Sequence, residues 1–312
     1  MKALDRIIGK YTGPERGPLI IAIGGMHGNE LAGIRALDML FHMLNVEPNH
    51  NPTFSYRGRL IGVRGNLQAC QLGVRFLEKD LNRQFTPDNI ERIRSTPLVE
   101  LKTEDRELKE LVELVDHEVA EYQPDRLLVI DLHTTTADGG IFSIATDDEA
   151  SVEMAKSLHA PVITGMLKGL RGTTLHYFCC DHFQCPTVSV TFEAGQHEDP
   201  LSTRRAIAAL VSLLRAVGSV RPEDVENRHD DLLLNYSQGL PKVAELLQVH
   251  SVKPNDRFRM LPGFRNFQPI KAGELLAQDK NGDIKSPVDA HILMPLYQNQ
   301  GEDGFFLIKV IE

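Results

Sequence analysis

The sequence predicts an α/β fold, in which a mostly parallel or mixed sheet is flanked by helices, with a small C-terminal all-β domain after it. Three observations predict this fold. Short apolar runs alternate with segments of helical periodicity over the first two-thirds of the chain, and such alternation favours a sheet covered on both faces. After about Pro222, β-like runs are separated by Gly, Pro and Asn. The 312 residues, 42% of them hydrophobic, also exceed what one core usually needs.

Each predicted element has its own pattern. The strands are continuous, branched apolar runs of the kind that is buried on both faces, and they span 18–25, 56–66, 125–133 and 185–195. The helices have apolar residues at steps of three and four, and they span 30–45, 105–122 and 202–218. In sheets of this kind, ligands bind outside the carboxyl ends of the strands.

The change of pattern predicts two domains, 1–222 and 225–312, with a boundary in the segment 226–239. Within the second domain, Asn281 and Gly282 stand between two apolar flanks. This dipeptide is a strong hairpin signal, since both positions of such a turn need positive φ.

Composition excludes several classes of function. Acidic residues outnumber Lys and Arg by 43 to 34, so we expect no nucleic-acid partner, which would need a basic face. We expect no membrane span, because no apolar stretch approaches ~18 residues, and no secretory signal, because the first residues lack an apolar core. The four cysteines form no disulfide framework, which favours a cytoplasmic protein with reduced thiols.

The strongest chemical signal is the sequence GGMHGNE at 24–30, directly after a predicted strand. His27 and Glu30 are three residues apart and would lie on one side of a helical turn. His133 ends another predicted strand, and Asp131 would share its face of that strand. Two His and one Glu are good zinc ligands, and Asp131 is placed to orient the His133 ring. Chance matches to H-x-x-E are common, and a His at a strand end is often a structural group.

A hydrolase also needs a proton acceptor beside its metal. Glu193 stands where the predicted strand VSVTFEAG ends. Burying a carboxylate in such an apolar run is costly without a partner. The alternative is a Glu that begins a loop in solvent.

Four motifs in this order, GGMHGNE, DLNRQF (80–85), DLHTTT (131–136) and TFEAG (191–195), resemble the succinylglutamate desuccinylase/aspartoacylase family of the zinc carboxypeptidase clan. The resemblance covers about 18–218, and the tail 273–297 resembles the family's C-terminal β domain. It implies a zinc carboxypeptidase-like fold and one Zn²⁺ per chain. The roles it implies are zinc ligands at His27, Glu30 and His133, a general base at Glu193, a carbonyl-polarising arginine at Arg75, and a substrate carboxylate held by Asn82 and Arg83.

The expected function is therefore zinc-dependent hydrolysis of the amide bond of a small N-acyl amino acid with a free carboxylate. The alternatives are a zinc carboxypeptidase acting on small peptides and a non-catalytic metal-binding protein. The family arginine and tyrosine that complete the substrate pocket have no counterpart in HYFCCDHFQCPTV or NQGEDGFFLIK. The sequence sets neither the acyl group, the amino acid, the native metal nor the oligomeric state, with which a homo-oligomer is compatible.

The segment LHYFCCDHFQC leaves a second zinc site open, although its adjacent cysteines do not match the usual ligand spacing. Buried thiols with loop histidines, or a rim of the substrate pocket, are the other interpretations. The candidate ligands are His176, Cys179, Cys180, His182 and Cys185. His197, four residues after Glu193, is close enough in sequence to reach the site, but we expect it to be an exposed loop residue.

Overall fold

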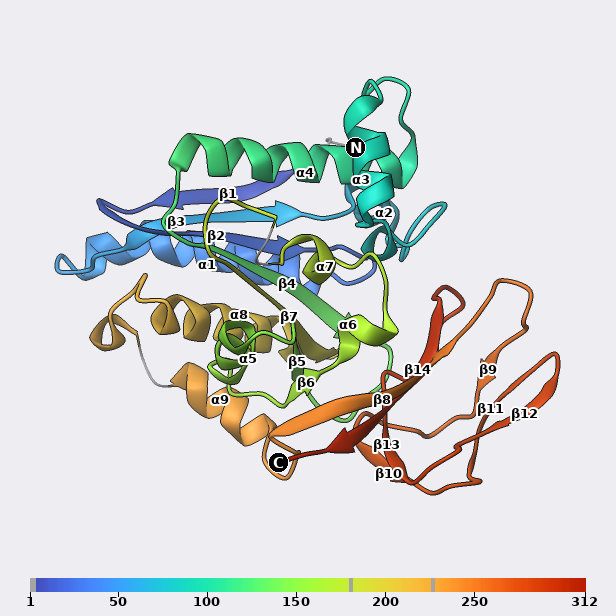
Figure 1. Cartoon of the computed structure of the whole chain (residues 1–312). Helices are drawn as coiled ribbons and strands as arrows, with labels where there is room; N and C mark the ends of the chain where they lie inside the picture. Colours follow the sequence, from blue (N-terminus) through green and yellow to red (C-terminus); the bar gives the residue numbers. More distant parts are fainter. Residues whose placement is uncertain (1–3, 180–181, 226–227) are drawn as a thin grey trace.

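The computed structural model describes residues 4–179, 182–225 and 228–312, and within them the strands form one sheet of eleven and one of three. The order in the large sheet is β1-β3-β2-β4-β7-β5-β6-β8-β14-β13-β10, and in the small sheet β12-β11-β9 (Figure 1). The strands are β1 Ile7–Thr12, β2 Glu15–Gly24, β3 Arg57–Arg64, β4 Leu127–Thr135, β5 Phe142–Ala145, β6 Val162–Thr164, β7 Thr187–Gln196, β8 Val243–Ser251, β9 Arg259–Met260, β10 Gln268–Ile270, β11 Leu275–Asp279, β12 Gly282–Lys285, β13 Ala290–Leu293 and β14 Asp303–Val310.

The helices connect and cover these strands. Helix α1 follows β2, α4 precedes β4 and α8 follows β7, and α1 and α4 are the two longest. The helices are α1 Ala32–His50, α2 Leu67–Leu72, α3 Pro87–Ser95, α4 Thr103–Tyr122, α5 Glu149–Lys156, α6 Met166–Gly169, α7 Thr174–Tyr177, α8 Leu201–Ala216 and α9 Arg228–Tyr236, with short 3-10 turns η1 Leu81–Arg83 and η2 Pro222–Asp224. Among the helices of the described residues, none has the length and apolar character needed to span a bilayer.

The centre of the large sheet, β3-β2-β4-β7, is parallel. In register, Ile23 of β2 lies beside Asp131 of β4, and His133 of β4 lies beside Glu193 of β7. The carboxyl ends of these strands therefore meet at one edge of the sheet. This edge is where the predicted site residues emerge.

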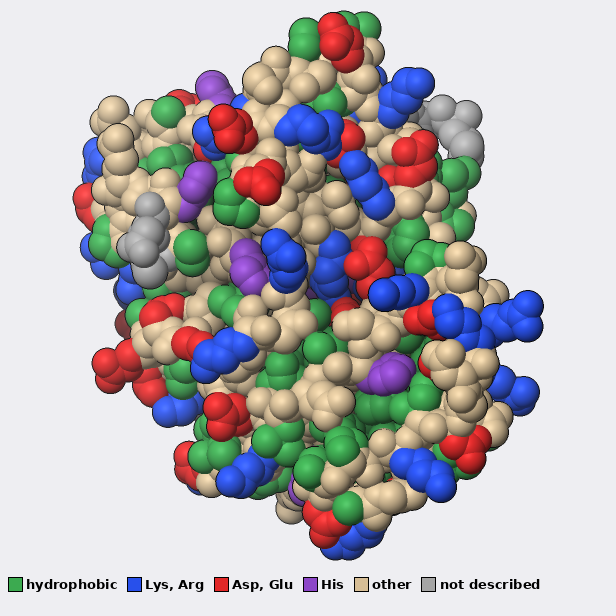
Figure 2. Space-filling model, turned by 45° about the vertical axis from the view of Figure 1, so that its right-hand side comes forward, with side chains coloured by type: hydrophobic (Ala, Val, Ile, Leu, Met, Phe, Trp, Pro, Cys, Tyr) green, Lys and Arg blue, Asp and Glu red, His purple; other side chains and the backbone are tan. Residues whose placement is uncertain are grey.

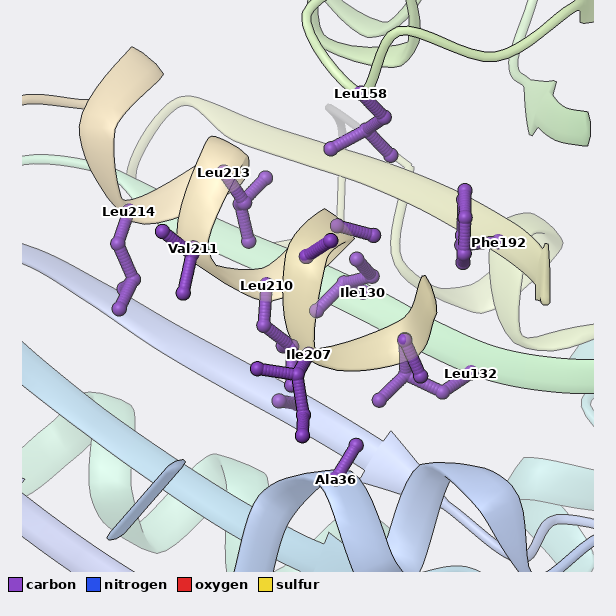
Figure 3. Close-up of a cluster of buried hydrophobic side chains, with 14 of the residues drawn as sticks. Ala36, Ile130, Leu132, Leu158, Phe192, Ile207, Leu210, Val211, Leu213 and Leu214 are labelled. Atoms are coloured by element: carbon purple, nitrogen blue, oxygen red, sulfur yellow. The ribbon is translucent and has the colours of Figure 1, made fainter. Parts of the chain in front are cut away.

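Both faces of the centre are buried. Along β2, alternate side chains belong to two separate apolar clusters, with Ile20 on one face and Leu19 and Ile21 on the other. Helices α1 and α8 cover the first face and α3 and α4 the second (Figure 1). In Figure 3 the side chains of α8 lie over β4 and β7, and Leu210 is fully buried. Each such leucine contributes about 1.5–3 kcal/mol by burial.

The C-terminal strands extend the same sheet. Strand β8 pairs in parallel with β6 and antiparallel with β14, and β13 and β10 follow antiparallel. We call β8-β14-β13-β10 the wing. The predicted α/β class, with a large sheet flanked by helices and a small C-terminal sheet, is confirmed. The domain division at 222–225 stays a prediction, and residues 226–227 of its boundary lie outside the described residues.

Some elements differ from expectation. Strand β1 was not predicted, and the region predicted as all-β begins with a helix, α9, whose Leu233 packs into the core under α8. The hairpin between β11 and β12 is confirmed, but Asp279 pairs with Gly282, and of the predicted dipeptide only Gly282 has positive φ, at 118°. The turn is therefore one residue earlier than the dipeptide predicted.

Candidate active site

The three predicted metal ligands meet at the carboxyl edge of the parallel centre. His27 and Glu30 lie in one turn between β2 and α1, in which the Glu30 amide donates to the His27 carbonyl at 3.1 Å. The turn follows Gly25, whose φ of 71° favours glycine. His27 Nδ1 is 2.8 Å from Glu30 Oε1, and His133 Nδ1 is 3.0 Å from Glu30 Oε2. All three side chains are buried, and their ligand atoms lie within 4.8 Å of one another.

Each histidine also faces an aspartate through its other ring nitrogen. His27 Nε2 is 3.1 Å from Asp80 Oδ1, and His133 Nε2 is 3.0 Å from Asp131 Oδ2. This orienting role was predicted for Asp131. Burial opposes the charged forms, but the neighbouring His27 and Arg75 hold the pKa of Asp80 well below its usual value. Asp80 therefore favours a proton on Nε2 of His27, whereas Asp131 lies at ion-pair distance from His133 Nε2 without a hydrogen bond to it.

This arrangement fits a metal ion. A neutral imidazole that carries its proton on Nε2 presents a lone pair at Nδ1. Both Nδ1 lone pairs would then face the Glu30 carboxylate, an arrangement that a cation bound between them stabilises. Two His and one carboxylate are a frequent donor set for catalytic zinc, and carboxylate partners on the ligand histidines are a common second layer of such sites.

Glu193 stands beside the cluster on the neighbouring strand. Its strand is anchored by Arg205 of α8, which donates to the Ala194 carbonyl at 3.4 Å and pairs with Asp199 at 2.7 Å. Glu193 is buried, and its Oε2 has no hydrogen-bond partner among the described residues. Burial raises the pKa of Glu193 to about 8, against the opposing charge of His133. Positive charge next to it favours the ionised form, which can accept a proton.

Arg75 lies next to the metal ligands. Its Nη2 donates to Asp80 Oδ2 at 2.9 Å, and its Nη1 is 3.5 Å from Glu30 Oε1. The carbonyl of Arg75 also accepts from the Gly28 amide at 3.1 Å, which ties this loop to the His27 turn. A guanidinium is thereby held at the rim of the candidate metal centre.

Asn82 and Arg83 come from the η1 turn, which Asp80 caps by accepting from the Asn82 amide at 2.9 Å. Asn82 Oδ1 accepts from the Thr174 amide at 2.9 Å. Arg83 Nη1 donates to the Asn82 carbonyl at 2.7 Å, and its Nη2 pairs with Asp303 of β14. A guanidinium has five N–H donors, and the described residues engage two of those of Arg83.

One cavity collects every site residue predicted from the sequence: His27, Glu30, Arg75, Asn82, Arg83, His133 and Glu193. Figure 2 shows a face of the molecule on which basic, acidic and histidine side chains are mixed. The wing contributes to the same cavity through Asp303 and Phe306.

Sequence reasoning missed three contributors. Asp80 was hidden in the DLNR motif, where only Asn82 and Arg83 were assigned roles. Asp303 has no local signal, because it reaches Arg83 across 220 residues. His197 was expected to be exposed, and this was wrong: it lines the cavity, its Nδ1 is 2.7 Å from Thr134 Oγ1, and its buried Nε2 has no partner among the described residues.

The second zinc site is not supported within the described part of the chain. His176 Nδ1 is 2.7 Å from Thr173 Oγ1, and its Nε2 is 3.2 Å from the Leu167 carbonyl. The ring of His182 packs against Tyr177, with centroids 4.2 Å apart. Within the described part of the chain, the only group of three possible metal ligands is His27, Glu30 and His133. Cys180 lies outside the described residues.

Comparison with known proteins bears on this geometry. Residues 16–217 match the family described as succinylglutamate desuccinylase/aspartoacylase catalytic domain. A probable aspartoacylase of Prochlorococcus marinus (strain MIT 9313) is 31% identical over 284 residues, 85% of this chain and 82% of that protein. A succinylglutamate desuccinylase of Pseudomonas putida (strain KT2440) is 24% identical over 280 residues, 83% of this chain and 72% of that protein.

A solved structure shares the fold. The product-bound ectoine utilization protein EutE (DoeB) from Ruegeria pomeroyi superposes with a TM-score of 0.64 at 19% identity, covering 95% of this chain and 85% of that one. The family match spans the whole parallel centre and every predicted site residue. The chain belongs to the succinylglutamate desuccinylase/aspartoacylase family, a family of enzymes that hydrolyse amides.

Proposed function

We propose that this protein is a zinc-dependent hydrolase that cleaves the amide bond of an N-acyl amino acid carrying a free carboxylate. The observation that carries the proposal is the buried His27–Glu30–His133 group with Glu193 in the same cavity, whose Oε2 has no hydrogen-bond partner among the described residues. Relatives named succinylglutamate desuccinylase and probable aspartoacylase support this reaction type.

His27, Glu30 and His133 would hold the zinc ion. When bound, zinc supplies Lewis-acid chemistry, which lowers the pKa of water from 15.7 toward about 7 and stabilises negative charge on oxygen. Asp80 and Asp131 lie 3.1 Å and 3.0 Å from the Nε2 atoms of the two imidazoles, whose Nδ1 atoms face Glu30. The protein therefore presents a preformed set of ligand atoms.

Glu193 is the general base and then the general acid. Its carboxylate accepts a proton from the attacking water as the new C–O bond forms. It passes this proton to the amide nitrogen as the C–N bond breaks, and the products are a carboxylic acid and an amine. Positioned acid–base groups of this kind contribute about 10²–10⁴-fold to rate.

Two arginines handle the negative charges of the substrate. Arg75 lies beside Glu30 and would donate to the carbonyl oxygen as it becomes an oxyanion. Arg83 and Asn82 would hold the substrate carboxylate, since a guanidinium offers paired donors that match a carboxylate. Asp303 keeps the Arg83 side chain facing the cavity.

The test is hydrolysis of a panel of N-acyl amino acids by the full chain as purified, after chelation, and after zinc is restored. Dipeptides serve as the comparison for carboxypeptidase activity. We expect amide hydrolysis that chelation abolishes and zinc restores, and slower cleavage of dipeptides. Zinc-loaded protein without activity on either panel would support a non-catalytic role, and faster cleavage of dipeptides would support a carboxypeptidase.

A further inference from the structure

The cavity is lined by two sets of residues, which we call its charged end and its apolar end. The charged end holds the metal ligands, Glu193 and the arginines. The apolar end is formed by residues from β5, α6, α7 and the wing: Ile144, Met166, Leu170, Leu175, Met294 and Phe306. The proposed reaction at the charged end does not use this wall.

The wall is built into the core and is not a collection of surface side chains. Ile144, Met166, Leu175 and Phe306 are buried and belong to one apolar cluster, against which Leu170 and Met294 pack. Packed side chains of this kind keep their shape when a ligand binds. The cavity therefore offers a fixed apolar surface.

This wall adjoins the groups that would hold the substrate carboxylate. Asn82 Oδ1 accepts from the amide of Thr174 at the start of α7, and the Phe85 amide donates to the Gly172 carbonyl at 2.9 Å. Leu170 and Leu175 flank this stretch. A carboxylate held at Arg83 would bring the substituent of its α-carbon close to the apolar wall.

No Lys or Arg of the described cavity lining remains for a second carboxylate. Among the described residues that line the cavity, Arg75 and Arg83 are the only Lys or Arg, and they pair with Asp80 and Asp303. Glu302, which is exposed, and Asp303 line the same cavity. An anionic side chain would lose its water without gaining a Lys or Arg partner, which is unfavourable.

We propose that the amino acid released by this enzyme has an uncharged, apolar side chain, and that the wall formed by Ile144, Met166, Leu170, Leu175, Met294 and Phe306 selects it. This inference rests on the proposed amide hydrolysis. Each additional methylene that the wall buries favours a substrate with a leucine- or methionine-sized side chain by about 10–200-fold. The lack of a Lys or Arg for a second carboxylate disfavours dicarboxylates further.

The test measures kcat/KM of the zinc-loaded full chain for N-acetyl derivatives of leucine, methionine and phenylalanine against those of aspartate, glutamate and ornithine. N-succinyl-leucine and N-succinyl-glutamate separate the effect of the acyl group from that of the side chain. We expect the apolar amino acids to exceed the charged ones by at least ~100-fold, with either acyl group. A preference for aspartate, glutamate or ornithine, or one set by the acyl group alone, overturns the inference but leaves amide hydrolysis standing. Inactivity on every compound overturns both proposals.

A variant locates the selectivity. Leu170 is half-buried, so Leu170→Arg can keep its charge near solvent at the cavity wall. We expect at least a ~10-fold shift in the kcat/KM ratio toward N-acetylaspartate, equivalent to one extra ion pair at the site. Leu247→Arg, at an exposed leucine of β8 outside the cavity, is the matched control. Met294→Lys tests a second half-buried position. If both cavity variants fold and leave the ratio unchanged, the wall does not face the side chain and the assignment fails.

Discussion

The parallel centre and the antiparallel wing belong to one sheet but contribute differently to the cavity. Strands β2, β4 and β7 bring charged groups to their carboxyl ends: His27 and Glu30 lie in the turn after β2, and His133 and Glu193 lie near the ends of β4 and β7. The wing contributes apolar surface and Asp303. The comparison teaches that the reaction chemistry is set where parallel strands end, whereas the fit of the substrate is set by the neighbouring strands that close the cavity.

The largest expected effect is at the centre. Glu193→Gln should lower kcat by about 10²–10⁴-fold, because the amide cannot accept a proton. Metal content should not change, and the free energy of unfolding should not fall, since Glu193 Oε2 has no partner to lose among the described residues. Rate assays, metal analysis and urea unfolding measure these quantities. Glu198→Gln, at an exposed position of the following loop, is the control. Undiminished turnover with intact metal would remove Glu193 from the mechanism.

The next effect tests the aspartates behind the ligands. Asp131→Asn and Asp80→Asn should each weaken zinc affinity by about 10–100-fold, because the charge that orients an imidazole is lost. Competition with a chromogenic chelator measures the affinity. Asp125→Asn, at an exposed residue just before β4, should leave it unchanged. Equal affinities in all three variants would mean that Asp80 and Asp131 do not orient the ligands.

One link between the wing and the site is the pair formed by Asp303 and Arg83. Both side chains are mostly buried, so Asp303→Asn should lower the free energy of unfolding by about 1–3 kcal/mol by leaving a buried guanidinium without its charged partner. Urea unfolding of the Asp303 variant, of an Arg83 variant and of the double variant gives the coupling energy of the pair. The neighbouring Glu302→Gln, at an exposed position, should have little effect. A coupling energy near zero would mean that this pair does not couple the wing to the site.

The smallest expected effect is at Asp230, where α9 contacts α8. Burial disfavours the charged form of Asp230, but hydrogen bonds from Arg215 and Ser212 lower its pKa. A carboxylate with a lowered pKa in the folded state adds stability above its unfolded pKa of about 3.9 and loses it as pH falls through the folded value. Asp230→Asn should therefore cost at most about 1 kcal/mol at neutral pH. In unfolding measured over a pH series, this difference should shrink below the unfolded pKa, and a constant difference would contradict the assignment.

The sequence predicted the centre well because its information is local. A buried strand that ends in His or Glu carries its signal within about ten residues, so β2, β4, β7 and the group His27, Glu30 and His133 could be found by pattern. The motif DLNR likewise identified Asn82 and Arg83, and both line the cavity.

The wing could not be predicted in this way. Its pairing of β8 with β6 and β14 joins segments far apart in the chain, and no local periodicity encodes such a partner. In the sequence, the residues of the apolar wall therefore cannot be distinguished from ordinary core residues. Strand β1 was missed because a short edge strand with mixed burial has little pattern of its own.

The most direct test of the account is anomalous diffraction at the zinc absorption edge from crystals of the zinc-loaded protein. We predict one strong peak within about 2.0–2.2 Å of His27 Nδ1, His133 Nδ1 and a Glu30 carboxylate oxygen, with Glu193 beside it and not among its ligands. A peak elsewhere, or two histidines that bind no common ion, would contradict the account.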